Sequence, residues 1–239
     1  MRIKIVFFNK NRVHVPFNAN KVFSLFLSQI AQENDFPEGS FNFSPLRSMN
    51  REVKEDGVLL ESPIVWYVTS PFADFVEKVQ DRLSESGLIK ICDQELLMER
   101  AVPLPTPDFT NNPIKFKCLS PITVSKVIRQ GGGDGPKEIF FNPHESEFYN
   151  RIRLDLIEKY RHCFGTLPKN NRIFLEFDKD YEIKKKKISK LIEIDGEKIK
   201  SWLSPFIMAG SPELLSIAYD WGVGNRNPMG FGMVEVVRA

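Results

Sequence analysis

The order of strand-type and helix-type segments near the start of this chain limits the folds that it can adopt. Strand segments are rich in β-branched and aromatic residues, as in RIKIVFF, and helix segments repeat their apolar residues at helical spacing. In chain order, the strand, helix, strand, strand, helix and strand segments are 2–8, 15–32, 40–46, 63–70, 70–87 and 88–104. Asn18 and Ser70 are the expected N-caps, and Gly87 is the expected end of the second helix. This order predicts a ferredoxin-like unit.

A cluster of prolines between residues 103 and 113 predicts a domain boundary, because proline interrupts regular structure. The predicted domains are therefore 1–112 and 113–239. The second half shows a similar order of strand-type and helix-type segments, with less distinct boundaries. Its expected segments are a strand at 115–128, a flexible tip at 130–136, a helix at 142–165, strands at about 172–178, 182–194 and 202–209, a short helix at 211–222 and a last strand at 232–238.

Charge is unevenly divided between the two halves of this 239-residue chain. Residues 1–112 carry 12 Lys/Arg and 15 Asp/Glu, whereas residues 113–239 carry 21 Lys/Arg and 16 Asp/Glu. A basic half favours a polyanionic partner on that side of the protein.

Cysteine spacing and hydropathy restrict the location and the chemistry. Cys92, Cys118 and Cys163 form no CxxC pair and are odd in number, which argues against a zinc site or a disulfide framework and favours a reducing cytoplasm. None of the three histidines belongs to a metal-ligand pattern. No apolar run approaches the roughly 20 residues that span a bilayer. The N-terminal MRIKIVFFNK lacks a small-residue cleavage site, so we interpret it as a strand and not as a signal peptide.

A glycine-rich loop, GVGNRNPMGFGMVEV (222–236), lies close to the C-terminus. It lacks the Gly-Lys-Ser/Thr of a Walker loop. It also fails the dinucleotide fingerprint, because Asn227 stands where the third glycine should be and a helix, not a strand, precedes the loop. One interpretation is that its backbone N–H groups approach a phosphodiester, with Arg226 neutralising charge. The other is a tight helix-to-strand turn that needs glycines for positive φ angles.

A lysine run, KKKKISK (184–190), is followed by Lys198 and Lys200 and is expected on a β-hairpin. A basic strand pair suits binding to an RNA backbone. The alternative is a solvated hairpin edge whose charge protects against aggregation.

The glycine-rich loop closely resembles the C-terminal signature of the CRISPR repeat-RNA processing endoribonucleases, within the repeat-associated (RAMP) ferredoxin-like superfamily. Other segments resemble this family's elements in the same order: VPFNANKVFSLFLSQI, FNFSPL, FKCLSPITV and ESEFYNRIRLDLIEKY. The resemblance implies an α+β fold of two tandem ferredoxin-like (RRM-like) domains that bind CRISPR repeat RNA. It further implies one metal-independent and cofactor-independent cut per repeat hairpin, which leaves a 2′,3′-cyclic phosphate. The candidate RNA-binding residues are Gly222, Gly224, Asn225, Arg226, Asn227, Gly230, Gly232, Lys184, Lys185, Lys186 and Lys187.

The catalytic residues are harder to place. Many members of the family supply a histidine just after the first helix, a tyrosine on that helix and a lysine nearby. Here AQENDFPEGS (31–40) contains none of these. The remaining candidates are Lys21 and Ser28 on the first helix, Arg47 with its neighbours Arg51 and Lys54, and His14 as the nearby imidazole. For Lys21, Ser28 and Arg47 the alternative interpretation is an ordinary solvent-facing surface.

Three functions therefore remain in competition. The first is a repeat-RNA endoribonuclease that acts by positioning and charge. The second is a protein of the same fold that binds the repeat without cutting it, which the missing histidine favours. The third is a structural subunit of a CRISPR RNA-guided complex. Repeat RNA is the expected partner, with CRISPR effector subunits and a homodimer as further candidates.

Overall fold

The computed structural model describes residues 1–128, 137–194 and 196–237 and divides into two compact units. Unit 1 comprises Met1–Pro107, Ile194–Gly196 and Asn227–Gly230, and unit 2 comprises Asp108–Glu193, Glu197–Arg226 and Phe231–Ala239. The chain first passes from one unit to the other within the proline-rich segment, a few residues before the predicted boundary. No helix in the described part of the chain is long and apolar enough to cross a membrane.

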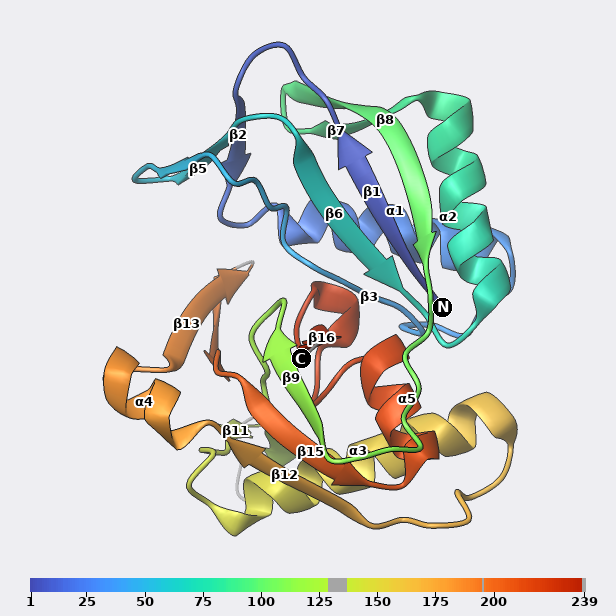
Figure 1. The fold of residues 1–239 in the computed structure, drawn as a ribbon. Helices are drawn as coiled ribbons and strands as arrows, with labels where there is room; N and C mark the ends of the chain where they lie inside the picture. Colours follow the sequence, from blue (N-terminus) through green and yellow to red (C-terminus); the bar gives the residue numbers. More distant parts are fainter. Residues whose placement is uncertain (129–136, 195, 238–239) are drawn as a thin grey trace. The chain divides into compact units, whose positions relative to one another are not determined.

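Unit 1 is built on an antiparallel sheet with the order β3-β6-β1-β8-β7 (Figure 1). Its elements are β1 (Arg2–Phe7), α1 (Asn20–Glu33), β3 (Asn42–Phe43), β6 (Ile64–Thr69), α2 (Ala73–Ser86), β7 (Leu88–Ile91) and β8 (Gln94–Leu104). Apart from the additional β7, this chain order and strand order are those of a ferredoxin-like unit, as predicted. The two helices contribute Phe23, Leu27, Phe75 and Val79 to the same core as Trp66 of the sheet. Burial of each such side chain stabilises the fold by about 1.5–3 kcal/mol.

Unit 1 also differs from the prediction. Residues 88–104 form the β7–β8 hairpin instead of one strand, because Cys92 turns the chain with a φ of 51°. A second sheet, of order β2-β5-β4, was not expected. Its strands are β2 (Val13–Pro16), β4 (Arg51–Val53) and β5 (Gly57–Leu60).

The predicted helix ends in unit 1 are partly correct. Gly87 ends α2 in the left-handed conformation, as expected. Asn18 is not the N-cap of α1, which has Ala19 at that position and no side-chain cap. Ser70 accepts a hydrogen bond from the Phe72 N–H, but Phe72 itself is the N-cap of α2.

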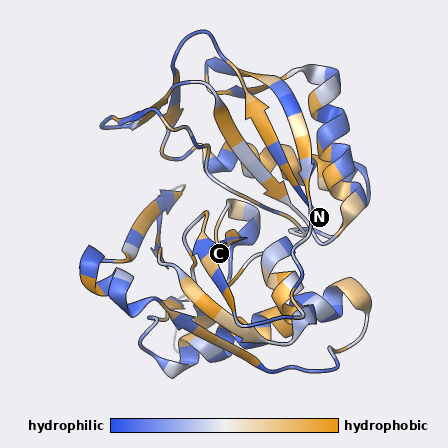
Figure 2. Cartoon of the chain, viewed as in Figure 1, coloured by the Kyte–Doolittle hydropathy of each residue, from blue (hydrophilic) through white to orange (hydrophobic). Residues whose placement is uncertain are grey.

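Unit 2 repeats the same topology, with the sheet order β12-β15-β9-β16. Its core elements are β9 (Ile114–Cys118), α3 (Ser146–Phe164), β12 (Ile173–Phe177), β15 (Phe206–Gly210), α5 (Pro212–Asp220) and β16 (Val234–Val236). Both helices pack on one face of the sheet, where Phe148 and Leu215 join Phe116 and Phe206 in the core. In Figure 2, the central strand β15 is coloured as hydrophobic along most of its length. The tandem ferredoxin-like architecture that the resemblance implied is confirmed.

Unit 2 has two hairpins and a short helix in addition to its ferredoxin-like core. They are the hairpin of β10 (Ser125–Ile128) and β11 (Lys137–Phe140), the hairpin of β13 (Ser189–Ile194) and β14 (Glu197–Trp202), and α4 (Lys179–Lys185). The predicted strand at 115–128 is therefore two strands, β9 and β10. The predicted tip at 130–136 lies outside the described residues.

The predicted strand at 182–194 is wrong over its first part, which belongs to α4. The Asp178 carboxylate caps this helix by accepting from the Tyr181 N–H. Acidic residues in its first turn and Lys184 and Lys185 in its last turn complement the helix dipole. Lys186 ends the helix in a left-handed conformation, and strand β13 begins only at Ser189. Lys184–Lys187 are thus at a helix end and not on a hairpin.

Candidate nucleic-acid interface

The glycine-rich loop joins α5 to β16 through a short 3₁₀ turn at Asn227–Met229. All four of its glycines have positive φ angles, of 108°, 76°, 81° and 71° for Gly222, Gly224, Gly230 and Gly232. Two of them also lie in crowded places. A Cβ on Gly224 would stand 2.3 Å from the Thr123 carbonyl oxygen, and one on Gly230 would stand 2.8 Å from the Phe43 ring. The turn interpretation therefore accounts for every glycine in the loop.

Four backbone N–H groups of the loop already have acceptors inside the protein. The N–H of Val223 donates to the Gly232 carbonyl, that of Asn225 to Thr123, that of Gly230 to Asn227 and that of Gly232 to Pro121. The four glycines and Asn227 are also buried. A phosphate could reach these N–H groups only by displacing their acceptors. RNA contact by the loop residues therefore stays a prediction.

Lys159 on α3 holds the first part of the loop, and sequence analysis did not find it. Its Nζ donates to the carbonyl oxygens of Gly222 and Gly224, at 3.0 and 2.9 Å, and to the Asp155 carboxylate at 2.6 Å. The Lys159 side chain is only 10% exposed. Burial raises the pKa of Asp155, although Lys159 opposes this shift. In the sequence this pair looks like an ordinary i,i+4 surface pair, and only the fold buries it.

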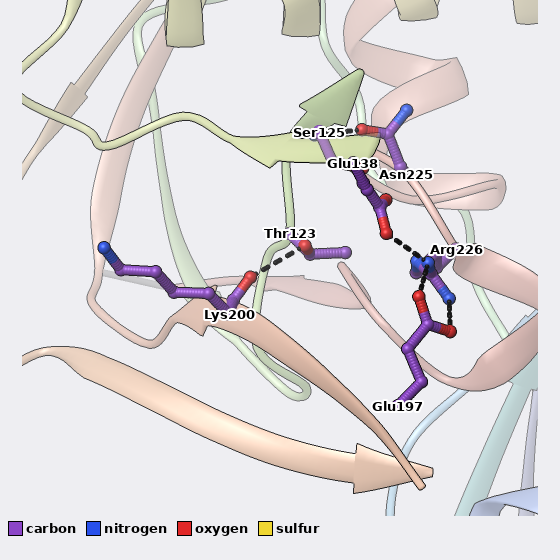
Figure 3. Close-up of polar contacts among 7 residues, drawn as sticks. All are labelled: Thr123, Ser125, Glu138, Glu197, Lys200, Asn225 and Arg226. Carbon is purple, nitrogen blue, oxygen red and sulfur yellow. Dashed lines mark hydrogen bonds and ion pairs between the residues drawn. The ribbon is translucent and has the colours of Figure 1, made fainter. Parts of the chain in front are cut away.

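Arg226 at the loop tip is tied to both hairpins of unit 2 (Figure 3). Its Nη2 lies 2.6 Å from Glu138 Oε2 on β11, and its guanidinium donates two further hydrogen bonds to Glu197 on β14. Burial alone would lower the pKa of Arg226, but the bonds to Glu197 and Glu138 outweigh it and raise the pKa. The neighbouring Asn225 Oδ1 accepts from the Ser125 N–H on β10 at 2.7 Å. Because two carboxylates surround one guanidinium, the loop tip is not a free cation.

Exposed lysines gather at the end of α4, in the segment after it and on the β13–β14 hairpin. We call these residues the lysine cluster: Lys184, Lys185, Lys186, Lys187, Lys190, Lys198 and Lys200. In the part of the chain that the structure describes, no carboxylate lies within 4.0 Å of any of these ammonium groups. Figure 2 colours most of α4 as hydrophilic. The lysine cluster is thus better suited to attract a polyanion than the glycine-rich loop.

Residues 104–236, more than half of the chain, match the family described as CRISPR associated protein Cas6, C-terminal. The chain belongs to this family. The resemblance found in the sequence is thereby confirmed.

Individual Cas6 relatives align with nearly the whole chain. An endoribonuclease-like protein Cas6 of Pyrococcus furiosus is 29% identical over 249 residues, covering 99% of this chain and 98% of the relative. A CRISPR-associated endoribonuclease, Cas6 1 of Methanocaldococcus jannaschii, is 25% identical over 245 residues, covering 98% and 92%. A solved structure characterising a Cas6-related gene from Pyrococcus furiosus has a TM-score of 0.84 at 26% identity, covering 99% of this chain and 98% of that one.

The catalytic candidates of this Cas6 chain lie on several elements of unit 1. Lys21 and Ser28 are exposed on α1, about 10 Å apart along its axis. Arg47 is half-buried, and its backbone pairs with Val65 beside the main sheet. His14 lies on β2, where its Nε2 is 3.1 Å from Asp56 Oδ1. The structure therefore distributes these residues over separate elements, and their catalytic roles stay predictions.

A hollow of about 560 Å³ lies at the end of α1, where the Cas6 resemblance leads us to expect the acid and base. Its lining residues are Ser28, Ala31, Gln32, Asp35, Phe36, Glu38 and Gly39. It thus holds one of the four catalytic candidates, Ser28, together with two carboxylic acids. Negative charge from Asp35 and Glu38 would oppose the charge that develops on a reacting phosphate. Among the described residues, no three or more His, Cys, Asp or Glu side chains are grouped to hold a metal ion.

Proposed function

We propose that this Cas6-family protein binds CRISPR repeat RNA and processes precursor CRISPR RNA as an endoribonuclease. The family match over residues 104–236 carries this proposal. A relative named as a CRISPR-associated endoribonuclease, which aligns with 98% of this chain, supports it.

The proposed reaction needs no metal and no cofactor. The 2′-OH beside the cut loses its proton and its oxygen bonds to the adjacent phosphorus. The bond from phosphorus to the 5′-oxygen then breaks, and that oxygen takes up a proton, leaving a 2′,3′-cyclic phosphate. We assign this chemistry to His14, Lys21, Ser28 and Arg47 of unit 1, with His14 held by Asp56. Without a dedicated acid and base the rate falls by about 10²–10⁴-fold, so we propose a slow enzyme.

RNA binding in this proposal relies first on the lysine cluster. Its ammonium groups have no carboxylate partner among the described residues, so each can neutralise a phosphate without breaking an ion pair. Arg226 can contact RNA only by exchanging Glu138 or Glu197 for phosphate. We therefore propose that the loop mainly holds the two hairpins in place.

A second candidate function is repeat binding without cleavage. The acidic hollow at the end of α1 favours it, because Asp35 and Glu38 stand where a cationic or imidazole group would assist the cut. Association with CRISPR effector subunits or a second copy of the chain belongs to the same proposal. We place the protein in the cytoplasm, since Cys92, Cys118 and Cys163 are all free thiols.

Incubation of the protein with end-labelled CRISPR repeat RNA in EDTA distinguishes these functions. We expect a discrete cut with a cyclic-phosphate end, which a 2′-deoxy substitution at the cut site abolishes while binding persists. A shifted but intact RNA would establish the binding protein instead. If the isolated repeat neither binds nor is cut, both proposals fail and a structural subunit is favoured.

A further inference from the structure

A hollow without acidic lining residues lies at the beginning of β12, an edge strand of the unit 2 sheet. It measures about 440 Å³, and its lining includes Arg153, Asn171, Arg172, Phe174 and Ala209. Arg153 comes from α3. Phe174 lies on β12, and Arg172 is the residue directly before that strand. The hollow is thus made wholly by unit 2, and none of these residues belongs to the lysine cluster or the glycine-rich loop.

The charge of this hollow is unbalanced. None of its lining residues is acidic. Within the described residues, neither Arg153 nor Arg172 has a carboxylate within 4.0 Å. Among the residues that the structure describes, Arg153 Nη2 donates only to the neutral Asn150 side chain, at 3.2 Å. Two guanidinium groups that share a hollow repel one another, so an anion bound between them would be stabilised.

The hollow also presents an aromatic ring. Phe174 is 56% exposed, and Ala209 lies opposite it in the antiparallel register. A methyl group is too small to cover the phenyl ring, which therefore keeps an open face. Exposed aromatic faces beside guanidinium groups are the combination with which proteins bind single-stranded nucleic acid, since a base stacks on the ring and cations neutralise the backbone.

We infer that this hollow binds a single-stranded segment of RNA, with a phosphate at Arg153 and Arg172 and a base stacked on Phe174. The inference rests on the proposed RNA-binding function and extends it to a second contact region. An extended acidic peptide paired with the β12 edge is the competing occupant. The exposed ring and the two guanidinium groups fit RNA better, because strand pairing needs neither.

Binding of a fluorescein-labelled octauridylate, measured over a range of salt concentrations, tests the site. We expect Phe174→Ala to weaken binding about fivefold or more, and Phe174→Trp to retain it. The double variant Arg153→Ala/Arg172→Ala should weaken binding and lower the salt slope by up to about 0.7, because one phosphate is no longer neutralised. The matched controls are Phe164→Ala, a ring that is 59% exposed outside the hollow, and Arg161→Ala on α3. Both controls should bind like the unchanged protein.

Photocrosslinking locates the base directly. A tetranucleotide of 5-iodouridine should attach to Phe174, within the tryptic peptide 173–179, and excess octauridylate should prevent the attachment. The inference alone would be overturned if crosslinks form only at other residues. It would also be overturned if the hollow variants bind octauridylate as the controls do while repeat RNA still binds to the protein. Loss of all binding to repeat RNA by the unchanged protein would instead overturn the proposed function. An octaglutamate peptide that competes equally well and shows the same sensitivity to the variants would reject RNA as the occupant.

Discussion

Arg226 and Glu197 form a two-point ion pair, with Nη1 at 2.9 Å from Oε2 and Nη2 at 2.5 Å from Oε1. Glu138 binds the same guanidinium from the other hairpin. The arginine that stands at the tip of the family's signature loop is therefore a clamp between three segments of unit 2. Its charge becomes available to a phosphate only when a carboxylate leaves.

Replacing both carboxylates, by Glu138→Gln with Glu197→Gln, should release the charge of Arg226. We expect tighter RNA binding and a salt slope that is steeper by up to about 0.7, because one more phosphate can be neutralised. Fluorescence anisotropy at several salt concentrations measures both quantities. Glu193→Gln on β13 removes a carboxylate from the same hairpin without touching Arg226 and serves as the control. An unchanged slope in the double variant would mean that Arg226 does not contact RNA.

Removing Lys184 and Lys185 together, as Lys184→Ala/Lys185→Ala, should weaken RNA binding. The salt slope should fall by up to about 1.4, since two unpaired cations are lost. Lys179→Ala is the matched control on the same helix, because Lys179 is already paired with Glu176 at 2.8 Å. Electrophoretic mobility shifts at increasing salt give the comparison. Equal losses in both variants would contradict the assignment of RNA binding to the lysine cluster.

Lys159→Met should destabilise the protein by about 1–3 kcal/mol, because the half-buried Asp155 carboxylate would lose its cationic partner. Urea unfolding measures the loss, and adding Asp155→Leu should restore part of it. The pKa of Asp155 is raised by burial, and removing Lys159 should raise it further. A raised pKa means that the folded state binds the proton more tightly. The variant should therefore regain stability relative to the unchanged protein as the pH falls through this pKa.

Gly224→Ala and Gly87→Ala distinguish two costs of adding a side chain, the backbone strain of a positive φ angle and a steric clash of the new Cβ. Both glycines have positive φ angles, of 76° and 70°. A Cβ on Gly87 meets nothing within 4 Å, whereas one on Gly224 would meet the Thr123 carbonyl at 2.3 Å. We expect Gly87→Ala to cost about 1 kcal/mol and Gly224→Ala several kcal/mol in the free energy of unfolding. Similar losses in both variants would show that the loop can shift to admit a side chain.

Local signals predicted the regular elements well. The apolar spacing of Phe23, Leu27 and Ile30 marked α1, and Gly87 and Gly165 marked the ends of α2 and α3. The sequence did not predict the turn at Cys92 or the helix α4. The turn at Cys92 that divides β7 from β8 uses a residue that does not favour a left-handed conformation. The helix α4 is only seven residues long and ends in a run of lysines, so its sequence shows no apolar residues at helical spacing.

By itself, the sequence determined the family and the two ferredoxin-like units. Element order and a signature loop are local properties that can be recognised in a linear chain. Only the tertiary structure decided which charges are available to a partner. Arg226 meets Glu138 and Glu197 from segments 88 and 29 residues away, and Lys159 meets the loop carbonyls 63 and 65 residues away. A charge is neutralised by its neighbours in space, and those neighbours depend on the folded sheet rather than on the adjacent residues.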